Sequence, residues 1–272
     1  MPLGDIQLDP KVKGRPRSCD IDRLKRHIEW GVENNAYWIG MGDYVDVASP
    51  SNRKAIKNAG FYDNVTAALE AQGDDTLEEL MEILEPTKGR WLGLLEGHHY
   101  LDYESGETSD TKLASFLGAP HLGTSTMVQV RFQPKGKKEA PSFTIWAHHG
   151  LGGGSTLGRP LNQLEAITKT FEADVYLVGH HHKKVVGKHN RIKAEFGTHG
   201  GTPRLVHKNV IIAGTGSFLK GYQQGSTQGR VPRGGYVEAG MMNPVALGGV
   251  VITARPRYDH VGYANVDLEV SI

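Results

Sequence analysis

The chain has 272 residues, of which 38% are hydrophobic and 22% are charged, and 31 Lys and Arg against 30 Asp and Glu leave a net charge of +1. This composition is typical of an ordinary globular protein, and it disfavours long disordered tails or a surface dominated by one charge sign. Thirteen histidines stand beside a single cysteine, Cys19, which excludes an intrachain disulfide and every metal site built from several cysteines. A transition metal in this protein must therefore be held by imidazole and oxygen ligands.

The first half of the chain alternates between helical and extended patterns. Apolar residues at helical spacing predict a helix over 20–33, and the short apolar run that follows predicts a strand over 37–41. A second helix is predicted over 64–85, with Gly73 as a point where it could break, before a second strand over 91–95. Strands that alternate with helices predict an α/β sheet covered by helices.

The second half begins in the same way and then changes character. A strand is predicted over 143–147, a helix beginning at Pro160 with Phe171 still on its apolar face, and a strand over 175–178. No helical pattern separates the last apolar runs, so the C-terminal third is predicted to consist of strands and loops. These runs cover residues 210–213, 250–253 and 264–270.

Each of the first four predicted strands leads directly into residues that bind metals. Ligands bind at the carboxyl ends of strands in open α/β sheets, so we expect these four ends to converge on one crevice. The four segments are Gly42-Asp43-Tyr44-Val45-Asp46, Gly97-His98-His99, His148-His149-Gly150 and Gly179-His180-His181-His182.

The last of these segments places two imidazoles on one side. His180 and His182 point the same way if the segment is extended, because side chains alternate along a strand, and His181 then points away. Two ions held by imidazoles and carboxylates need a bridging anion, for which Asp43 is the candidate. Two metals about 3.5–4 Å apart can clamp a phosphoryl group and activate a water, which is the chemistry of ester hydrolysis.

The ordered motifs resemble those of the calcineurin-like metallophosphoesterases, which are D-x-H, G-D-x-x-D, G-N-H-[DE], H-G and G-H-x-H. The resemblance begins with Asp5-Ile6-Gln7 and ends at His182, and the chain is also similar to compact members of the family from phages and prophages. It implies a four-layer αββα sandwich with its metal site at the C-terminal ends of strands. It further implies one domain over residues 1–272, with the Gly-rich part 190–272 completing the second sheet.

The resemblance also implies a role for each matching residue. Asp43 would bridge two divalent ions, with Mn²⁺ as the first choice and Fe, Zn, Ni or Mg as alternatives. His99 occupies the position of the catalytic histidine, which protonates the leaving-group oxygen or stabilises the transition state, and Asp46 would orient it. One ion would be held by Asp5, Gln7, Asp43 and His182, and the other by Asp43, His98, His149 and His180.

Three positions depart from the family pattern. Gln7 replaces a histidine with a neutral amide oxygen, which is a poorer ligand for a transition metal, and His98 replaces an asparagine. Tyr100 replaces an acidic residue, for which Asp102 is a candidate substitute. Two choices stay open: His148 competes with His149 as the ligand, and the motif at residues 5–7 could be a merely polar N-terminus.

These observations favour a binuclear metal-dependent phosphoesterase that cleaves a phosphomono- or phosphodiester by attack of metal-bound hydroxide. The alternative is a catalytically weak metal-binding module that recognises nucleic acid or a protein partner. A metallo-β-lactamase-like hydrolase is a distant third, because its H-x-H-x-D-H run is absent. The expected partner is a phosphoester substrate, with a nucleotide or nucleic acid as a candidate, and no membrane or obligate protein partner is expected.

Weaker features have ordinary explanations that we favour. Arg53 could reach a substrate phosphate but is more simply an exposed arginine, and the glycine-rich segment 150–156 is more simply a flexible rim than a phosphate cradle. The basic segment 11–26 could follow a nucleic acid backbone, but acidic residues dilute it and a solvated surface is favoured. The first residues show no basic region followed by an apolar stretch, so we expect no signal peptide and a cytoplasmic protein.

Overall fold

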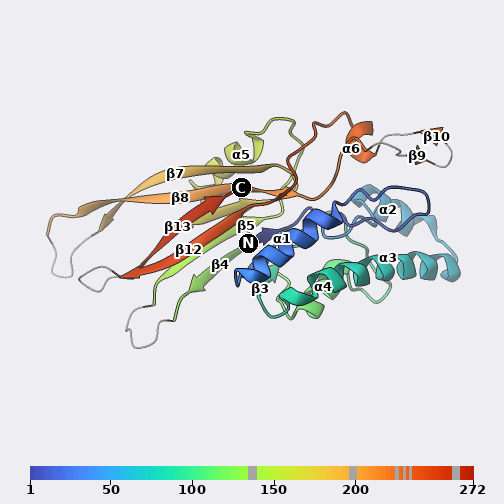
Figure 1. Cartoon of the computed structure of the whole chain (residues 1–272), viewed down its shortest axis with the longest axis horizontal. Helices are drawn as coiled ribbons and strands as arrows, with labels where there is room; N and C mark the ends of the chain where they lie inside the picture. Colours follow the sequence, from blue (N-terminus) through green and yellow to red (C-terminus); the bar gives the residue numbers. More distant parts are fainter. Residues whose placement is uncertain (134–139, 196–200, 224–226, 229–230, 233–234, 259–263) are drawn as a thin grey trace.

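The computed structural model describes all residues except 134–139, 196–200, 224–226, 229–230, 233–234 and 259–263. The described part is a mixed α/β structure with several sheets and six α-helices, in agreement with the class expected from the alternating patterns (Figure 1). The helices are α1 (Ile21–Glu33), α2 (Pro50–Ala59), α3 (Asp63–Leu84), α4 (Ser109–Leu117), α5 (Arg159–Ile167) and α6 (Tyr236–Ala239).

The first sheet is small and parallel. It consists of β1 (Pro2–Leu3), β2 (Trp38–Gly40) and β3 (Trp91–Leu94), in the order β1-β2-β3. One face of this sheet packs against helices α1, α3 and α4, which confirms the apolar faces predicted for the first two helices. The buried residues that these three helices contribute are Leu24 and Ile28 of α1, Leu77, Leu80 and Leu84 of α3, and Leu113 and Leu117 of α4.

The second sheet is larger and mixed. Its order is β11-β8-β6-β5-β4, with β7 paired to β8 in addition, and β5, β6 and β8 run parallel to one another. Trp146, Tyr176 and Ile212 on one face pack against Leu164 of α5. The strands are β4 (Ser125–Arg131), β5 (Ser142–His148), β6 (Val175–Val178), β7 (Lys184–Glu195), β8 (Arg204–Ser217) and β11 (Gly248–Gly249).

A second hydrophobic cluster joins the two sheets. Ile39, Met41 and Leu95 from the first sheet and the turns after it meet Ala147 and Leu177 of the second. The strands β12 (Val251–Tyr258) and β13 (Ala264–Ser271) pair only with each other and pack against this cluster from outside. The C-terminal part therefore completes the second sheet through β8 and β11, whereas β12 and β13 form a separate ribbon.

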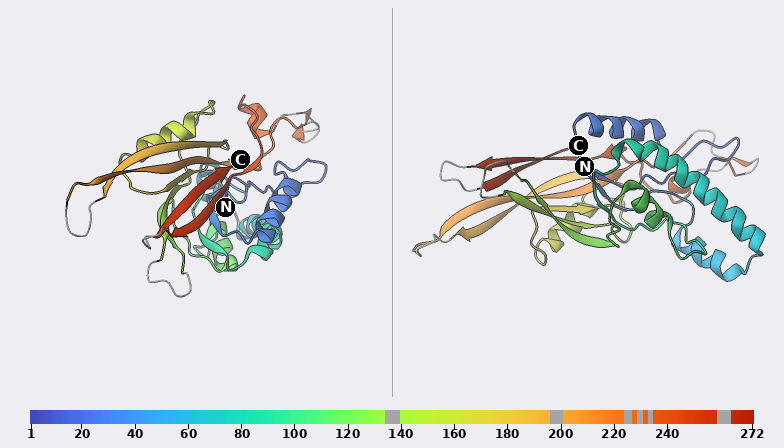
Figure 2. Two further views of the ribbon diagram at one scale, coloured as in Figure 1. Left: turned by 60° about the vertical axis from the view of Figure 1, so that its left-hand side comes forward. Right: turned by 90° about the horizontal axis from the view of Figure 1, so that it is seen from below.

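Two short strands and a 3₁₀ turn complete the described elements. β9 (Thr227–Gln228) and β10 (Val231–Pro232) pair with each other, and the 3₁₀ turn (Glu85–Thr87) follows α3. In Figures 1 and 2 the helices α1 to α4 gather at one end of the molecule, while β7, β8, β12 and β13 extend toward the other end. Among the residues described, no helix combines the length and the apolar character needed to cross a membrane.

The structure refines three of the predicted helices and strands. Helix α3 continues through Gly73 without a break. A side chain at this position would collide with Leu101, so the glycine allows the helix to pack closely against that residue. Helix α5 ends at Ile167, so Phe171 lies beyond it. The run predicted over 210–213 is only the buried middle of β8, whose first six residues are not buried and follow no apolar pattern.

Candidate metal centre

The four predicted strand ends meet, and they come from both sheets. Asp43 follows β2 and His98 follows β3 in the first sheet, while His149 follows β5 and His180 follows β6 in the second. One ligand atom from each of these four residues lies within 4.8 Å of all the others. The turns after the strands therefore build one cluster across the junction of the two sheets.

The three imidazoles of this cluster meet edge to face. The ring centroid of His98 lies 4.6 Å from that of His149 and 4.7 Å from that of His180. The Nδ1 atoms of His98 and His180 are 3.2 Å apart. Three imidazole rings offer one another few complementary hydrogen-bond partners. Their convergence is therefore the arrangement expected where a cation binds.

His149 has its tautomer set by the main chain. Its Nδ1 lies 2.6 Å from the carbonyl oxygen of Met41, to which it can only donate. This leaves Nε2, which is buried, has no hydrogen-bond partner and lies 3.4 Å from Asp43 Oδ2. A histidine whose other ring nitrogen donates to a carbonyl is the usual arrangement of a metal ligand.

A second group of donors borders Asp43. Gln7 Nε2 lies 3.5 Å from Asp43 Oδ2 and 3.3 Å from His182 Nε2, which is itself 3.5 Å from Asp5 Oδ1. Asp5 is fully buried; its Oδ2 accepts a hydrogen bond from the main-chain N–H of His180, while its Oδ1 accepts none. The amide of Gln7 faces the same group, where its oxygen rather than its nitrogen would bind an ion.

The backbone at five of the predicted ligands is in the left-handed region. Their φ angles lie between 47° and 62°, a conformation that residues other than glycine adopt at a cost of about 1–3 kcal/mol each. Such strain persists only where the surrounding structure holds the backbone in place, and it is common at functional sites. Here the strained turns direct side chains from successive strand ends toward the cluster around Asp43. The five residues are Asp5, Gln7, Asp43, His180 and His182.

Burial and charge set the protonation of this cluster. Burial raises the pKa of Asp5 to about 8. Burial acts on Asp43 in the same direction, but the contact and charge of His149 outweigh it and hold the pKa of Asp43 below its usual range. Burial lowers the pKa of His180 to about 3 and that of His182 to about 4, and neighbouring histidines act in the same sense. Neutral His180 and His182 thus lie beside the buried carboxyl groups of Asp5 and Asp43.

These features fit divalent metal ions. Carboxylates, imidazoles and one amide oxygen are ligands that Mn²⁺, Fe and Zn accept. Two buried atoms, Asp5 Oδ1 and His149 Nε2, lack hydrogen bonds, although such atoms are nearly always paired in folded proteins. Asp43 borders both groups of donors.

Metal binding is expected to release protons. For His149 burial lowers the pKa, but Asp43 outweighs it and raises the value to about 9, so both His149 and Asp5 hold a proton at pH 7 in the ion-free chain. An ion must displace both protons, and the apparent affinity for Mn²⁺ should therefore rise by up to about 100-fold per pH unit below pH 8. Isothermal titration at pH 7, in two buffers of different ionisation enthalpy, should show release of about two protons. Equal heats in the two buffers would contradict this assignment.

His99 and Asp46 form a pair beside the cluster. His99 Nδ1 lies 2.7 Å from Asp46 Oδ1. Burial lowers the pKa of His99, but the hydrogen bond to Asp46 and the charge of Asp43 outweigh it, so the pKa rises above its usual value. The main-chain N–H of His99 also donates to Asp43 Oδ1 over 3.1 Å. The ring of His99 is therefore held by Asp46, and its main chain is bonded to the candidate bridging residue Asp43.

Asp110 supports the cluster from outside the sequence motifs, and Gly97 supports it from within one of them. The main-chain N–H of Gly97 donates to the buried carboxylate of Asp110 over 3.0 Å, at the start of α4. Asp110 lies within the capping box that Thr108 and Thr111 make at the start of this helix. Gly97 itself presses against Asp43, whose main-chain nitrogen and carboxylate a side chain would overlap.

Gly97→Ala is expected to destabilise the fold by about 1–3 kcal/mol and to lower metal content, because the new methyl group must displace Asp43. Thermal unfolding and metal analysis measure the two effects. Gly153→Ala is the matched control, because a side chain there meets no atom within 4 Å. Equal metal content in the two variants would show that Gly97 does not position Asp43.

Arg53 serves neither of the two roles considered from the sequence. It is largely buried, and its guanidinium donates to the carbonyl oxygens of Ala48, His98 and Tyr100 and stacks 3.7 Å from the Tyr100 ring centroid. Arg53 therefore links the loop that carries Asp46 to the loop that carries His99 through these hydrogen bonds. Asp102, the proposed substitute acid, pairs with Arg53 instead, with Oδ2 lying 3.8 Å from Arg53 Nε.

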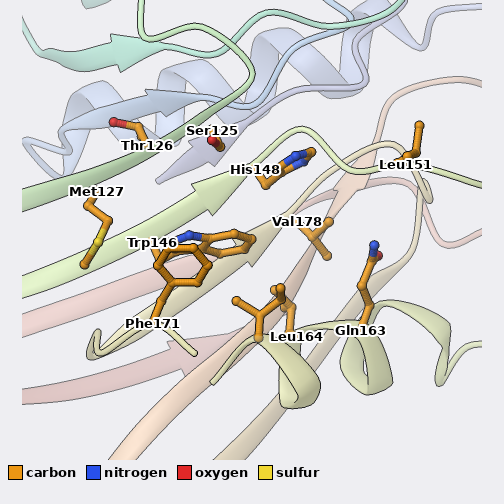
Figure 3. A pocket seen from close by; sticks show the side chains of 11 residues that line it. Ser125, Thr126, Met127, Trp146, His148, Leu151, Gln163, Leu164, Phe171 and Val178 are labelled. Atoms are coloured by element: carbon orange, nitrogen blue, oxygen red, sulfur yellow. The ribbon is translucent and has the colours of Figure 1, made fainter. Parts of the chain in front are cut away.

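His148 and His181 turn away from the cluster. His148 stacks on Trp146 and lines a pocket of about 480 Å³ on the α5 side of the second sheet, as Figure 3 shows. His181 Nε2 lies 2.9 Å from Oε1 of Gln163, which lines the same pocket. Of the two adjacent histidines at the end of β5, it is therefore His149 that joins the group that could hold a metal ion.

The structure brings all nine predicted site residues into one continuous set of contacts. Asp43 touches both donor groups, and it accepts hydrogen bonds from the main chain of His98 and His99. No protein-family model matches the sequence, and no curated protein matches it either.

Proposed function

We propose that the protein is a metal-dependent phosphoester hydrolase that uses two divalent ions. The observation that carries the proposal is the position of Asp43, whose Oδ2 lies 3.4 Å from His149 Nε2 and 3.5 Å from Gln7 Nε2. A single carboxylate thus borders both donor groups, as a bridging ligand must. Ions bound at the two groups lower the pKa of a water molecule and neutralise the charge of a phosphoryl group.

The proposal assigns separate roles to the metal ligands and to the pair of His99 and Asp46. Asp5, Gln7 and His182 hold one ion, His98, His149 and His180 hold the other, and Asp43 is shared. His99 donates a proton to the leaving-group oxygen, since its pKa is raised and Asp46 fixes its ring by the bond to Nδ1. The ester is a phosphomono- or phosphodiester, and nucleotides and nucleic acids are among the candidates.

The proposal includes membership of the calcineurin-like metallophosphoesterases and their four-layer αββα sandwich. The hydrophobic clusters support it: one lies between helices α1, α3 and α4 and the first sheet, one between the two sheets, and one between the second sheet and α5. The only cysteine, Cys19, is a buried free thiol, which is consistent with the proposed cytoplasmic location.

The test is hydrolysis of 4-nitrophenyl phosphate and bis-(4-nitrophenyl) phosphate with added Mn²⁺, together with metal analysis. The native protein is compared with Asp43→Asn purified in the same way, which controls for contaminating phosphatases. We expect metal-dependent release of nitrophenol by the native protein alone, and the favoured ester identifies a phosphatase or a phosphodiesterase. Absence of metal and of activity with every ion tried, or equal activity in the variant, would overturn the proposal.

A further inference from the structure

The strands β7 and β8 form a ribbon whose charge differs from that of the rest of the chain. They contain six Lys and Arg and one acidic residue, Glu195, a net charge of +5. The whole chain carries +1, so all other residues together carry −4. The basic residues are Lys184, Lys188, Arg191, Lys193, Arg204 and Lys208.

The outer half of this ribbon, residues 188–195 and 204–209, is largely exposed and contacts the rest of the protein at Arg191 and Lys208. None of the first six residues of β8 is buried, whereas the last eight all are. Lys188 and Lys193 on β7 are exposed as well. Figures 1 and 2 show the two strands extending beyond the sheet at the end opposite helices α1 to α4. Five of the six cations lie in this half; Lys188, Lys193, Arg204 and Lys208 are exposed there, whereas Arg191 is only partly exposed.

The charges within the ribbon are unbalanced, although Glu195 stands directly opposite Arg204. Arg191 stands directly opposite Lys208, a cross-strand arrangement of like charges that destabilises a sheet. Arg191 turns to the carbonyl oxygens of Thr168 and Phe171, and Lys208 pairs with Asp174. The side chain of Lys193 makes no hydrogen bond or ion pair with any residue in the described part of the chain.

The neighbouring ribbon shows the opposite pattern. On β12 and β13, Arg255 stands across from Asp267 and lies 2.6 Å from Glu269, while Arg257 pairs with Asp267. Each arginine there has an acidic partner on the other strand. The excess of positive charge is therefore particular to β7 and β8.

We propose that the outer half of the β7–β8 ribbon is a docking surface for the phosphate backbone of duplex nucleic acid. A two-stranded β-ribbon fits the major groove of a duplex. Residues 188–195 extend about 25 Å at about 3.3 Å per residue, which spans several phosphates. The surface lies away from the metal centre, because β7 begins two residues after His182 and its basic half is at the far end. It goes beyond the proposed hydrolysis and does not depend on it.

The side chains of the outer half favour a duplex over other polyanions. It contains no Phe, Tyr or Trp, on which proteins stack the bases of single strands. Its exposed aliphatic residues Ile192 and Leu205 are flanked by Asn190, His207 and Asn209, so it lacks the continuous apolar face that an anionic membrane would bury.

The test is fluorescence anisotropy of a labelled DNA duplex titrated with the full-length protein in EDTA, over a range of salt concentrations. The ribbon variant carries Lys188→Gln, Lys193→Gln and Arg204→Gln. The control variant carries the same change in charge at exposed residues of the basic N-terminal segment, as Lys13→Gln, Lys25→Gln and Arg26→Gln. A third variant, with Lys188→Arg, Lys193→Arg and Arg204→Lys, keeps the charge of the ribbon.

We expect salt-dependent binding by the native protein and at least about tenfold weaker binding by the ribbon variant. The slope of log affinity against log salt should fall by about one for each phosphate that the variant no longer neutralises, while the control and charge-keeping variants bind like the native protein. Circular dichroism verifies that each variant is folded. Absence of saturable binding by the native protein, equal weakening in the control variant, or tighter binding to single-stranded DNA or phosphatidylserine vesicles would each overturn the proposal.

Discussion

Replacing Asp43 with asparagine is expected to abolish phosphoester hydrolysis and metal binding together. Asparagine has nearly the same size, and its side-chain oxygen can still accept the hydrogen bonds from the main chain of His98 and His99. The variant loses only the negative charge that faces both donor groups. Because that charge offsets two divalent ions, we expect metal content to fall below one ion per chain and activity to fall by about 10³-fold or more.

The control for this variant is Asp102→Asn. It makes the same chemical change on the loop after β3, but Asp102 is 49% exposed and its ion pair is with Arg53. We expect native metal content and nearly native activity there, which atomic absorption and ester hydrolysis measure. An Asp43→Asn protein that keeps two ions would show that Asp43 does not bridge them.

Replacing His99 with alanine should separate catalysis from metal binding. The His99 ring contacts Asp46 and is not part of the group of close ligand atoms, so metal content should stay native. Loss of the proton donor should lower kcat by about 10²–10⁴-fold, with a smaller fall for Asp46→Asn, which leaves the ring in place but less firmly held. Metal analysis and steady-state kinetics on the same preparations measure both quantities.

The choice of ester shows how His99 acts. Phenolate is a stronger base than nitrophenolate, so the defect of His99→Ala should be larger with phenyl phosphate than with 4-nitrophenyl phosphate. His148→Ala is the matched control, since His148 faces Trp146 on the other side of the second sheet. A defect of equal size with both esters would favour transition-state stabilisation over proton donation, and equal loss in His148→Ala would remove the special role of His99.

The sequence was informative where chemistry depends on residues that are adjacent in the chain. The glycine beside each histidine pair marked the turns. The extended segment expected at His180 and His182 is wrong, because both residues have left-handed φ angles. The choice of His149 over His148 agrees with the alternation of a strand, since the two side chains face opposite sides of the sheet. These are local rules, and they apply before any tertiary contact exists.

What the sequence could not supply depends on contacts between distant segments. Arg53 belongs to no motif. Its role in linking the two loops becomes visible only when α2 brings it to the carbonyl oxygens of His98 and Tyr100. Helix α2 has no buried residue, so it lacks the apolar period that reveals a helix. Asp110 likewise reaches Gly97 only because α4 folds back toward the first sheet.

The candidate metal centre draws its donors from two sheets that are built by separate parts of the chain. Residues up to His98 supply Asp5, Gln7 and Asp43, and only the part after residue 123 supplies His149 and the histidines that follow it. Neither part alone contains a complete set for either ion. Bound metal would thus act as a clamp that reports whether the two halves have docked, and two separately expressed fragments should gain tight metal binding only when they are mixed.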